Sequence, residues 1–404
     1  MTARRQPKTM TNSSNNNNSK NILCISSVDW FPIPTRKQQV MARLPGDYRV
    51  LYIEPPITLL SPVKDRRLFF KLTAFLTGLR EVEENVLAYS PPPVLPFGNV
   101  YRWINRINQW WQSLFIKNQV KKAGLKNPAA WTYMPNSLDL IKKIEHSFLI
   151  YDCIDEHAEY KGFVNKDTLL EMEKELVKES NLVFVTAPGL YKTRKEMNPN
   201  TFLIPNGVNF QLFNQAASPE MPAAEEIKDI KKPVIGFVGV IQEWIDLELI
   251  YKIAGENPSW SVVMVGPVGA GVNVEKLKSL PNVYFTGAKK PEELPQYIRA
   301  FDVCINPFRP SKLTENVSPL KFYEYLATGK PVVTVDMPAV KQYKDCVYIA
   351  SHHRDFVEKI KLALSAQESA SREKRISEGK KCSWENRVAQ MLEIKEKMLG
   401  DISP

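Results

Sequence analysis

A lysine and a glutamate three positions apart, Lys321 and Glu324, interrupt the largely apolar segment SPLKFYEYLATGKPVV. In a helix the two side chains lie on the same face, one turn apart. The N-terminus of a helix attracts phosphate, and a lysine in its first turn adds a full positive charge. A carboxylate one turn further on can accept hydrogen bonds from two sugar hydroxyls. The pattern therefore favours a nucleotide-sugar site; the alternative is a surface ion pair on a helix that packs into the core.

Capping residues predict where this helix begins and ends. Ser318 is a favourable N-cap, and Pro319 suits the first helical position. Gly329 suits the position just after the last turn, and Pro331 prevents continuation. We therefore predict a helix over residues 319–328, followed by the strand PVVTVD.

Short apolar strand patterns alternate with amphipathic helix patterns along the 404-residue chain. This alternation predicts the α/β class, with parallel sheets covered by helices on both faces. Each half has its own strands, so we predict two Rossmann-like, doubly wound domains that bind ligands at the carboxyl ends of their strands. The strand patterns are NILCISSVDW, RVLYIEPP, FLIYDCIDE, LVFVTAP, TFLIPNG, VIGFVGVI, SVVMVGPVG, VYFTGA, FDVCINPF and PVVTVD.

Composition predicts the domain boundaries. The first 20 residues lack the apolar stretch of a secretory signal and are predicted to be a disordered polar tail. A segment rich in proline, alanine and acidic residues predicts a linker at 211–230, between an N-terminal domain at 21–210 and a C-terminal domain at 231–380. Residues 381–404 are predicted to form a final helix, capped by Ser383, and a tail.

The formal net charge of +10 is concentrated beside aromatic residues. Residues 61–125 contain ten Lys and Arg against four acidic residues. In the segment YRWINRINQWWQSLFIKNQVKK, one predicted helical stripe contains Ile104, Ile107, Trp111 and Leu114. Basic, tryptophan-rich helices are typical of proteins that bind anionic membranes. The alternative is a core-packing helix with a solvated basic edge. No nucleic-acid-binding motif accompanies the charge, so nucleic acid is not an expected partner.

The cysteines and histidines do not predict a metal site. The five cysteines are scattered and contain no CxxC pair, which favours buried reduced thiols in a cytoplasmic protein. His352 and His353 lack nearby carboxylate or cysteine partners at ligand spacing and are interpreted as surface residues. No apolar run reaches the roughly 18 to 20 residues that a membrane span needs.

Taken in order, these segments resemble the retaining GT-B glycosyltransferases of group 1, most closely the bacterial enzymes of teichuronic acid biosynthesis. The resemblance covers about residues 21–398. Its matching pieces are RVLYIEPP, WTYMPNSLDL, FLIYDCIDEHAEY, LVFVTAP, IPNGVNFQLF, GFVGVIQEWIDLELI, VYFTGAKKPEELPQYIRAFDVCINPF, SPLKFYEYLATGKPVV and SWENRV.

The resemblance implies transfer of a hexose from a UDP- or GDP-linked sugar to a cell-surface polysaccharide or lipid-linked glycan, with retention of configuration. The N-terminal domain would face the acceptor and the C-terminal domain would bind the donor. No cofactor or metal is expected beyond the nucleotide sugar. The expected location is the cytoplasm, including the inner face of the cell membrane.

The resemblance also implies roles for individual residues. Catalytic groups would be Lys321, Asp155 and Arg309, although Asp155 could instead cap a helix. The donor would contact Glu324, Asn316, Ser318, Pro319, Leu320, Lys312, Gly239, Thr286, Gly287 and Lys289. The acceptor side would include Trp30, Arg36, Gln38 and His157; the first three could equally form a solvated loop, and His157 could lie on a loop surface.

Two departures from the family pattern leave alternatives open. The family often has a glutamate eight residues before the one that matches Glu324, and here this position is Asn316. The segment GFVGVIQEWIDLELI also lacks the usual basic residue, for which Arg309, Lys312 and Lys321 are the available substitutes. The alternatives are a nucleotide-sugar epimerase or hydrolase of the same fold, and a non-catalytic partner that binds nucleotide or membrane.

Overall fold

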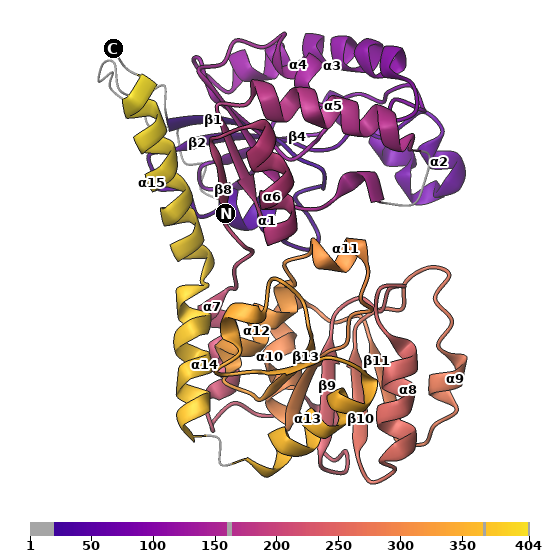
Figure 1. The fold of residues 1–404 in the computed structure, drawn as a ribbon. Coiled ribbons are helices and arrows are strands. Elements are labelled where there is room, and N and C mark those ends of the chain that lie inside the picture. The colour runs from indigo at the N-terminus through magenta and orange to yellow at the C-terminus, as the bar shows by residue number, and fades with distance from the viewer. Residues whose placement is uncertain (1–19, 160–163, 367–368, 403–404) are drawn as a thin grey trace, which may run out of the picture. The chain divides into compact units, whose positions relative to one another are not determined.

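The computed structural model describes residues 20–159, 164–366 and 369–402 (Figure 1). The chain divides into two compact units. The first unit comprises the described residues of Met1–Pro32, Leu44–Asp152 and Lys161–Asn181. The second unit comprises those of Ile33–Arg43, Cys153–Tyr160 and Leu182–Pro404. Two sheets that consist mainly of parallel strands confirm the predicted α/β class.

The six-stranded sheet of the second unit is entirely parallel, in the order β11-β10-β9-β12-β13-β14. The order of the strands therefore reverses between β9 and β12, the point at which ligands of such sheets bind. Its strands are β9 (Val234–Val238), β10 (Ser261–Val265), β11 (Val283–Gly287), β12 (Val303–Asn306), β13 (Val332–Val335) and β14 (Tyr348–Ala350).

The eight-stranded sheet has the order β3-β4-β2-β1-β5-β6-β7-β8 and reverses between β1 and β5. Among the pairings described, only β3 with β4 is antiparallel. Its strands are β1 (Asn21–Ile25), β2 (Arg49–Ile53), β3 (Arg80–Glu83), β4 (Val86–Tyr89), β5 (Ala129–Thr132), β6 (Phe148–Cys153), β7 (Leu182–Val185) and β8 (Thr201–Leu203).

The α-helices connect and cover these strands. They are α1 (Arg36–Met41), α2 (Ser61–Lys64), α3 (Arg102–Lys122), α4 (Leu138–Ile141), α5 (Lys166–Glu179), α6 (Pro188–Met197), α7 (Phe210–Asn214), α8 (Leu247–Glu256), α9 (Glu275–Lys278), α10 (Leu294–Ala300), α11 (Lys312–Glu315), α12 (Leu320–Thr328), α13 (His353–Ser365), α14 (Ser369–Lys381) and α15 (Trp384–Ile402). Short 3₁₀ helices include η2 (Arg66–Leu72), η3 (Ala74–Thr77), η4 (His157–Glu159), η5 (Gln215–Ala217), η6 (Glu225–Ile227), η7 (Pro291–Glu293) and η8 (Lys341–Tyr343).

Helix α12 confirms the predicted helix to within one residue. Pro319 is the N-cap, so Ser318 lies one position before the cap, and the prediction that Ser318 caps the helix is wrong. The Ser318 hydroxyl lies 2.9 Å from the Tyr323 hydroxyl and accepts a hydrogen bond from a neighbouring loop, which holds it away from the cap position. At the other end, Gly329 adopts the left-handed conformation, with φ of 72°.

Helix α14 fixes the C-terminal end of α12, beside which it runs (Figure 1). The fully buried Arg375 donates from Nε to the Gly329 carbonyl at 3.1 Å and from Nη1 to the Cys346 carbonyl at 3.1 Å. A guanidinium at a helix C-terminus is also favoured by the helix dipole. Gly379 allows close packing, because a Cβ there would lie 2.6 Å from the Ala327 nitrogen.

Helix α3 has an unusual distribution of side chains. Its buried face contains four amide side chains, Asn105, Asn108, Gln112 and Gln119, and the half-buried Gln109 lies beside them. Of the predicted apolar stripe, Ile104 is buried, whereas Ile107, Trp111 and Leu114 are exposed. Ile116 and Val120 are buried as well, so α3 contributes both apolar and amide side chains to the core, and its contact with a membrane stays a prediction.

All ten strand patterns form strands, and Ser383 caps α15 by accepting a hydrogen bond from the Asn386 backbone at 3.3 Å. The segment predicted as a linker is not an exposed connection, because Phe213, Ala224 and Ile227 belong to the buried core of the second unit. The domain boundaries stay a prediction. The predicted tail at 1–20 lies outside the described residues apart from Lys20.

The cysteines are buried, as the sequence predicts. Among the described residues, no cluster of His, Cys, Asp and Glu is arranged to hold a metal ion. None of the helices in the same part of the chain combines the length and apolar character required to cross a bilayer.

Replacement of Arg375 should show how strongly α12 depends on its C-terminal anchor. Arg375→Met keeps an unbranched apolar chain but leaves two buried carbonyls without their charged donor. We expect a loss of about 2 to 4 kcal/mol in urea unfolding. The control is Lys374→Met, because Lys374 is exposed and its Asp345 partner is 3.5 Å away; its effect should stay within about 0.5 kcal/mol. Equal effects of the two substitutions would contradict the role of Arg375 in fixing the C-terminal end of α12.

Candidate functional site

The ammonium group of Lys321 lies at the reversal point of the six-stranded sheet. Its Nζ is 5.2 Å from the ring centre of Phe237, on β9, and 4.9 Å from that of Phe308, just after β12. The two rings therefore hold the cation at the carboxyl ends of the two strands between which the order reverses. The lysine itself comes from the first turn of α12.

Gly239 makes room for this lysine. It follows β9 directly, and a Cβ at this position would lie 2.7 Å from Lys321 Cε and 3.2 Å from Nζ. Its φ of 138° is also a conformation that residues with side chains rarely adopt. Glycine is therefore required at 239 for two independent reasons.

Lys321 and Glu324 both have strongly shifted pKa values. Burial lowers the pKa of Lys321 to about 8, and the nearby Glu324 carboxylate opposes this shift. Burial raises the pKa of Glu324 to about 7, opposed by the Lys321 charge. Within the described residues, neither group forms a direct ion pair. The pair is therefore not the surface salt bridge of the alternative interpretation, and desolvation dominates its electrostatics.

Hydrogen bonds from Asn206 fix the segment just before α12. The Asn206 backbone donates to Ser318 Oγ at 3.1 Å, and its Nδ2 donates to the Ser318 carbonyl at 2.7 Å. The Ser318 side chain is thus used within the protein, and its contact with the donor stays a prediction. Asn206 Oδ1 is buried, and no other described residue bonds it.

A cavity of about 290 Å³ lies at the start of α12, and all of its lining residues belong to the second unit. It brings together six of the predicted site residues: Arg36, Asp155, Ser318, Pro319, Leu320 and Lys321. Phe308, Trp244 and Asn206 also line it. The cavity therefore combines cationic groups, a carboxylate and apolar walls.

The other predicted donor residues and Arg309, which was predicted to be catalytic, lie outside this lining. Arg309 and Lys312 are exposed, and Asn316 ends α11, donating from Nδ2 to the Lys312 carbonyl at 3.0 Å. Thr286 Oγ1 is buried with no partner in the described part of the chain, and Gly287 adopts a φ of 71°.

The predicted contact of Lys289 with the donor is unsupported. The ammonium of Lys289 lies 2.5 Å from Glu226 Oε2, and Tyr297 donates to the same oxygen at 2.7 Å. The hydrogen bond to Glu226 raises the pKa of Lys289. Its charge is therefore already neutralised inside the second unit.

Two predicted acceptor residues have structural roles instead. Trp30 is buried, packs edge-to-face on Tyr52 at 4.9 Å, and donates from its backbone to Glu54 at 3.0 Å. Gln38 is buried and forms the capping box of α1, accepting a hydrogen bond from the Thr35 backbone at 2.9 Å. Burial excludes the solvated loop for these two residues, and their contact with the acceptor stays a prediction.

The remaining acceptor candidates are Arg36 and His157. Arg36 is buried rather than solvated and donates from Nη1 to the Pro205 carbonyl at 3.2 Å. His157 begins the short helix η4. Sequence reasoning did not find Phe237, Phe308 or Asn206. An aromatic residue near the end of each switch-point strand, GFVG and INPF, was the available signal for the two rings.

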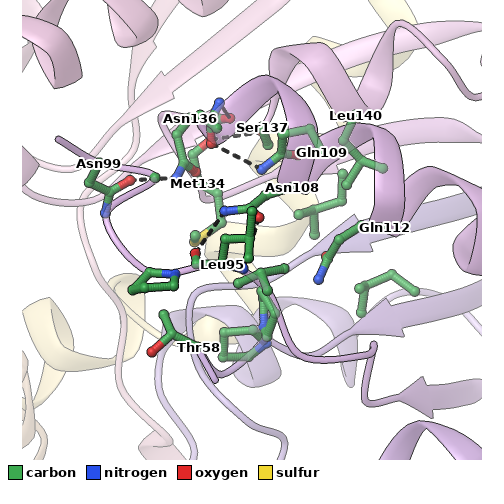
Figure 2. Close-up of a pocket in the computed structure, with 18 of the residues that line it drawn as sticks. Thr58, Leu95, Asn99, Asn108, Gln109, Gln112, Met134, Asn136, Ser137 and Leu140 are labelled. Atoms are coloured by element: carbon green, nitrogen blue, oxygen red, sulfur yellow. Dashed lines mark hydrogen bonds between the residues drawn. The ribbon is translucent and has the colours of Figure 1, made fainter. Parts of the chain in front are cut away.

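A second cavity, of about 430 Å³, lies within the first unit (Figure 2). It opens at the carboxyl ends of β1, β2 and β5, the reversal point of the eight-stranded sheet, and the amide face of α3 lines one side. Each sheet therefore has a cavity where its strand order reverses.

Comparison with known proteins agrees with this geometry. Residues 232–366 match the family described as "Glycosyl transferases group 1". This match agrees with the predicted resemblance over that part of the chain, and the solved structures below show that the described chain has the GT-B fold.

The relatives found by sequence and by structure are as follows. A Bacillus subtilis (strain 168) protein, provisionally named the teichuronic acid biosynthesis glycosyltransferase TuaH, is 35% identical over 160 residues. The match spans 38% of this chain and only 40% of that relative's length. Sucrose-phosphate synthase from Thermosynechococcus elongatus has a TM-score of 0.69 at 16% identity and covers 95% of this chain and 100% of its own. Anabaena HepE, solved with UDP and glucose, has a TM-score of 0.64 at 13% identity and covers 93% and 99%.

The aromatic environment of Lys321 predicts a measurable titration. With ¹³C-labelled lysine, one Cε resonance should titrate near pH 8 and disappear in Lys321→Gln. Phe308→Leu keeps the apolar wall but removes one ring that favours the cation, so the pKa should fall further, by up to about one pH unit. A Lys321 resonance that titrates at the ordinary value of about 10.4 would contradict the buried position.

Proposed function

We propose that this protein is a glycosyltransferase that transfers a hexose from a nucleotide diphosphate sugar to a cell-surface polysaccharide or lipid-linked glycan. The observation that carries the proposal is the Lys321 ammonium, held at the switch point of the second sheet with Glu324 one turn along the same helix. The solved structures of Anabaena HepE with UDP and glucose and of an E. coli protein with UDP-2-fluoro glucose support a UDP-linked donor. Retention of configuration rests on the family resemblance alone.

The geometry suggests a division of roles along α12. Lys321 would contact the diphosphate, whose charge grows as the bond to the sugar breaks, and a preformed cation there lowers the barrier. A lysine held without an anionic partner has no ion pair to break before the ligand binds. Glu324 would accept hydrogen bonds from the ribose hydroxyls, which explains why a carboxylate occupies a desolvated position.

Lys321 would supply the positive charge of the basic residue that is missing after β9, the first strand of the second unit's sheet. Its Cε and Nζ lie next to Gly239, the residue that follows β9. The α12 lysine therefore places a positive charge beside the strand end where the family usually has one. This position favours an active transferase over a non-catalytic nucleotide-binding partner. Asp155 lines the same cavity and is the carboxylate we propose for contact with the transferred sugar or the acceptor.

Two substitutions on α12 test the donor site. Glu324→Gln keeps the side-chain shape and should reduce UDP affinity about ten- to a hundredfold, because a hydrogen bond to a charged group is worth roughly 1.5 to 3 kcal/mol. Lys321→Ala should reduce turnover more than UDP affinity, because the leaving group gains charge in the transition state. Calorimetry with UDP and turnover across a panel of nucleotide sugars measure both effects, with circular dichroism as the folding check.

Lys344→Ala is the control for Lys321→Ala, because Lys344 is an exposed lysine of the second unit that is not among the predicted site residues. Wild-type affinity and turnover in both α12 variants would contradict the proposal. Consumption of a nucleotide sugar at the same rate with and without acceptor extract would favour the epimerase or hydrolase instead.

We also propose that α3 and the neighbouring 3₁₀ helices bind the inner, anionic face of the cell membrane, where a lipid-linked acceptor would lie. Exposed aromatic and aliphatic side chains support this: Phe69, Phe70, Leu76, Trp103, Ile107, Trp110, Trp111 and Leu114. Phe75 of η3 contacts Phe115 of α3 at 5.7 Å between ring centres, so these side chains form one surface. Arg66, Arg106 and Lys117 form no ion pair with any described residue, which leaves their charge available to anionic lipid.

Vesicle binding tests this surface. Binding should require anionic lipid and weaken as salt rises, because each basic residue near such a surface contributes about 1 kcal/mol. Trp103→Ser combined with Trp110→Ser should weaken it by removing exposed aromatic rings. Leu362→Ser is the control, because Leu362 is equally exposed, at 52%, in the second unit. Equal binding to neutral and anionic vesicles, or none to either, would refute the membrane proposal.

A further inference from the structure

The cavity of the first unit differs in charge from the donor site. Of its 23 lining residues none is Lys, Arg or His, and Glu54 is the one ionisable side chain. Arg80 pairs with Glu54 Oε2 at 2.6 Å, and the Trp30 backbone donates to Oε1 at 3.0 Å. The carboxylate is therefore already satisfied. A phosphate or carboxylate ligand would enter this cavity without a lining cation to offset its desolvation.

The uncharged polar groups of the cavity are mostly amides. Asn108 is fully used, since it donates to the Leu95 carbonyl and accepts from the Leu95 backbone, both at 2.9 Å. Gln112 donates to the Pro92 carbonyl at 3.1 Å. These two amides shape the wall and are not available to a ligand.

Two other amide side chains of the cavity each have a buried oxygen that can accept a hydrogen bond from a ligand. Gln109 donates from Nε2 to Asn105 Oδ1 at 3.4 Å, and Asn136 donates from Nδ2 to Asn99 Oδ1 at 2.7 Å. Their own oxygens, Gln109 Oε1 and Asn136 Oδ1, are buried and have no partner within the described residues. Figure 2 shows both side chains on the same side of the cavity, with Thr58 opposite. A buried acceptor without a donor costs roughly 1 to 3 kcal/mol, so a ligand that brings hydroxyl donors is favoured here.

The rest of the lining is apolar. Leu60, Leu95, Phe97, Met134 and Leu140 contribute to it, together with several prolines. A volume of about 430 Å³ is sufficient for one small ligand. Hydroxyl donors on one side and carbon–hydrogen surface on the other are the properties of a sugar ring with an apolar substituent.

We propose that this cavity binds an uncharged, hydroxyl-bearing sugar unit of the acceptor, next to an apolar part of the same molecule, and selects against acidic and phosphorylated sugars. The inference rests on the proposed transferase function, to which it adds the chemical class of the acceptor. Gln109 and Asn136 accept hydrogen bonds from the sugar hydroxyls, and the Leu95–Phe97 wall contacts its carbon–hydrogen face.

Binding of two matched probes tests the inference. Hexyl β-glucoside is neutral, and hexyl β-glucuronide adds one carboxylate to the same ring. In calorimetry with the full chain, the glucoside should bind and the glucuronide should bind at least tenfold more weakly. Gln109→Met should weaken glucoside binding about three- to tenfold, which is the value of one net hydrogen bond. Asn118→Leu, at an exposed position of the same helix, should leave it unchanged.

A variant that gains binding of a ligand excludes unfolding as the explanation of its changed affinity. Leu95→Lys adds a cation to the rim of the cavity and should strengthen glucuronide binding while leaving UDP affinity unchanged. Normal UDP binding with no binding of either glycoside would overturn the inference and leave the donor site intact. Equal or tighter binding of the glucuronide to the wild type would also overturn it. Failure of the wild type to bind UDP would instead count against the proposed function.

Discussion

The position of one cation, the Lys321 ammonium, constrains much of the second unit. A desolvated ammonium without a partner is unfavourable, so the surrounding residues must hold it in place and offer partial compensation. The rings of Phe237 and Phe308 supply that compensation, and a glycine at 239 leaves the necessary space. The helix that carries the lysine is fixed at its start by Asn206 and at its end by Arg375. An arriving diphosphate would offset the electrostatic cost of the desolvated ammonium, which would favour diphosphate binding.

Helix α3 also has an arrangement of side chains that is unfavourable unless other groups bind to it. Amide side chains share its buried face with Ile104, Ile116 and Val120, and aromatic, aliphatic and basic side chains occupy its exposed face. An ordinary core helix has the reverse distribution, because apolar burial stabilises folding and buried amides need partners. The inversion becomes favourable when the amides satisfy loop carbonyls and a ligand, and when the exposed face meets a lipid surface. Two bound surfaces on opposite sides of one helix would account for a sequence that neither stability nor solubility alone explains.

Patterns that depend on neighbouring residues could be predicted from the sequence, and patterns that depend on distant ones could not. Ten apolar runs gave ten strands, and the capping residues placed α12 to within one residue. The missed strands β3, β4, β5 and β14 read REVE, VLAY, AAWT and YIA, and each contains charged residues or alanine, which are poor strand formers. The contacts of Trp30 depend on Tyr52 and Glu54, which are distant in sequence, whereas the capping box of Thr35 and Gln38 is a local pattern that could have been predicted. The ion pair of Lys289 could not be predicted because Glu226 is 63 residues away in sequence.

The two cavities have complementary chemistry, which follows from the reaction that we propose. A nucleotide diphosphate sugar has its negative charge in the group that leaves, so the cation belongs with the donor. Cations in the acceptor cavity would bind the same diphosphate and compete with the productive arrangement. A neutral cavity lined by amides and apolar residues avoids this competition and still recognises hydroxyls. The lining of the first unit's cavity has no Lys, Arg or His, although the chain has a formal net charge of +10. This distribution of charge would keep the donor diphosphate out of the acceptor cavity.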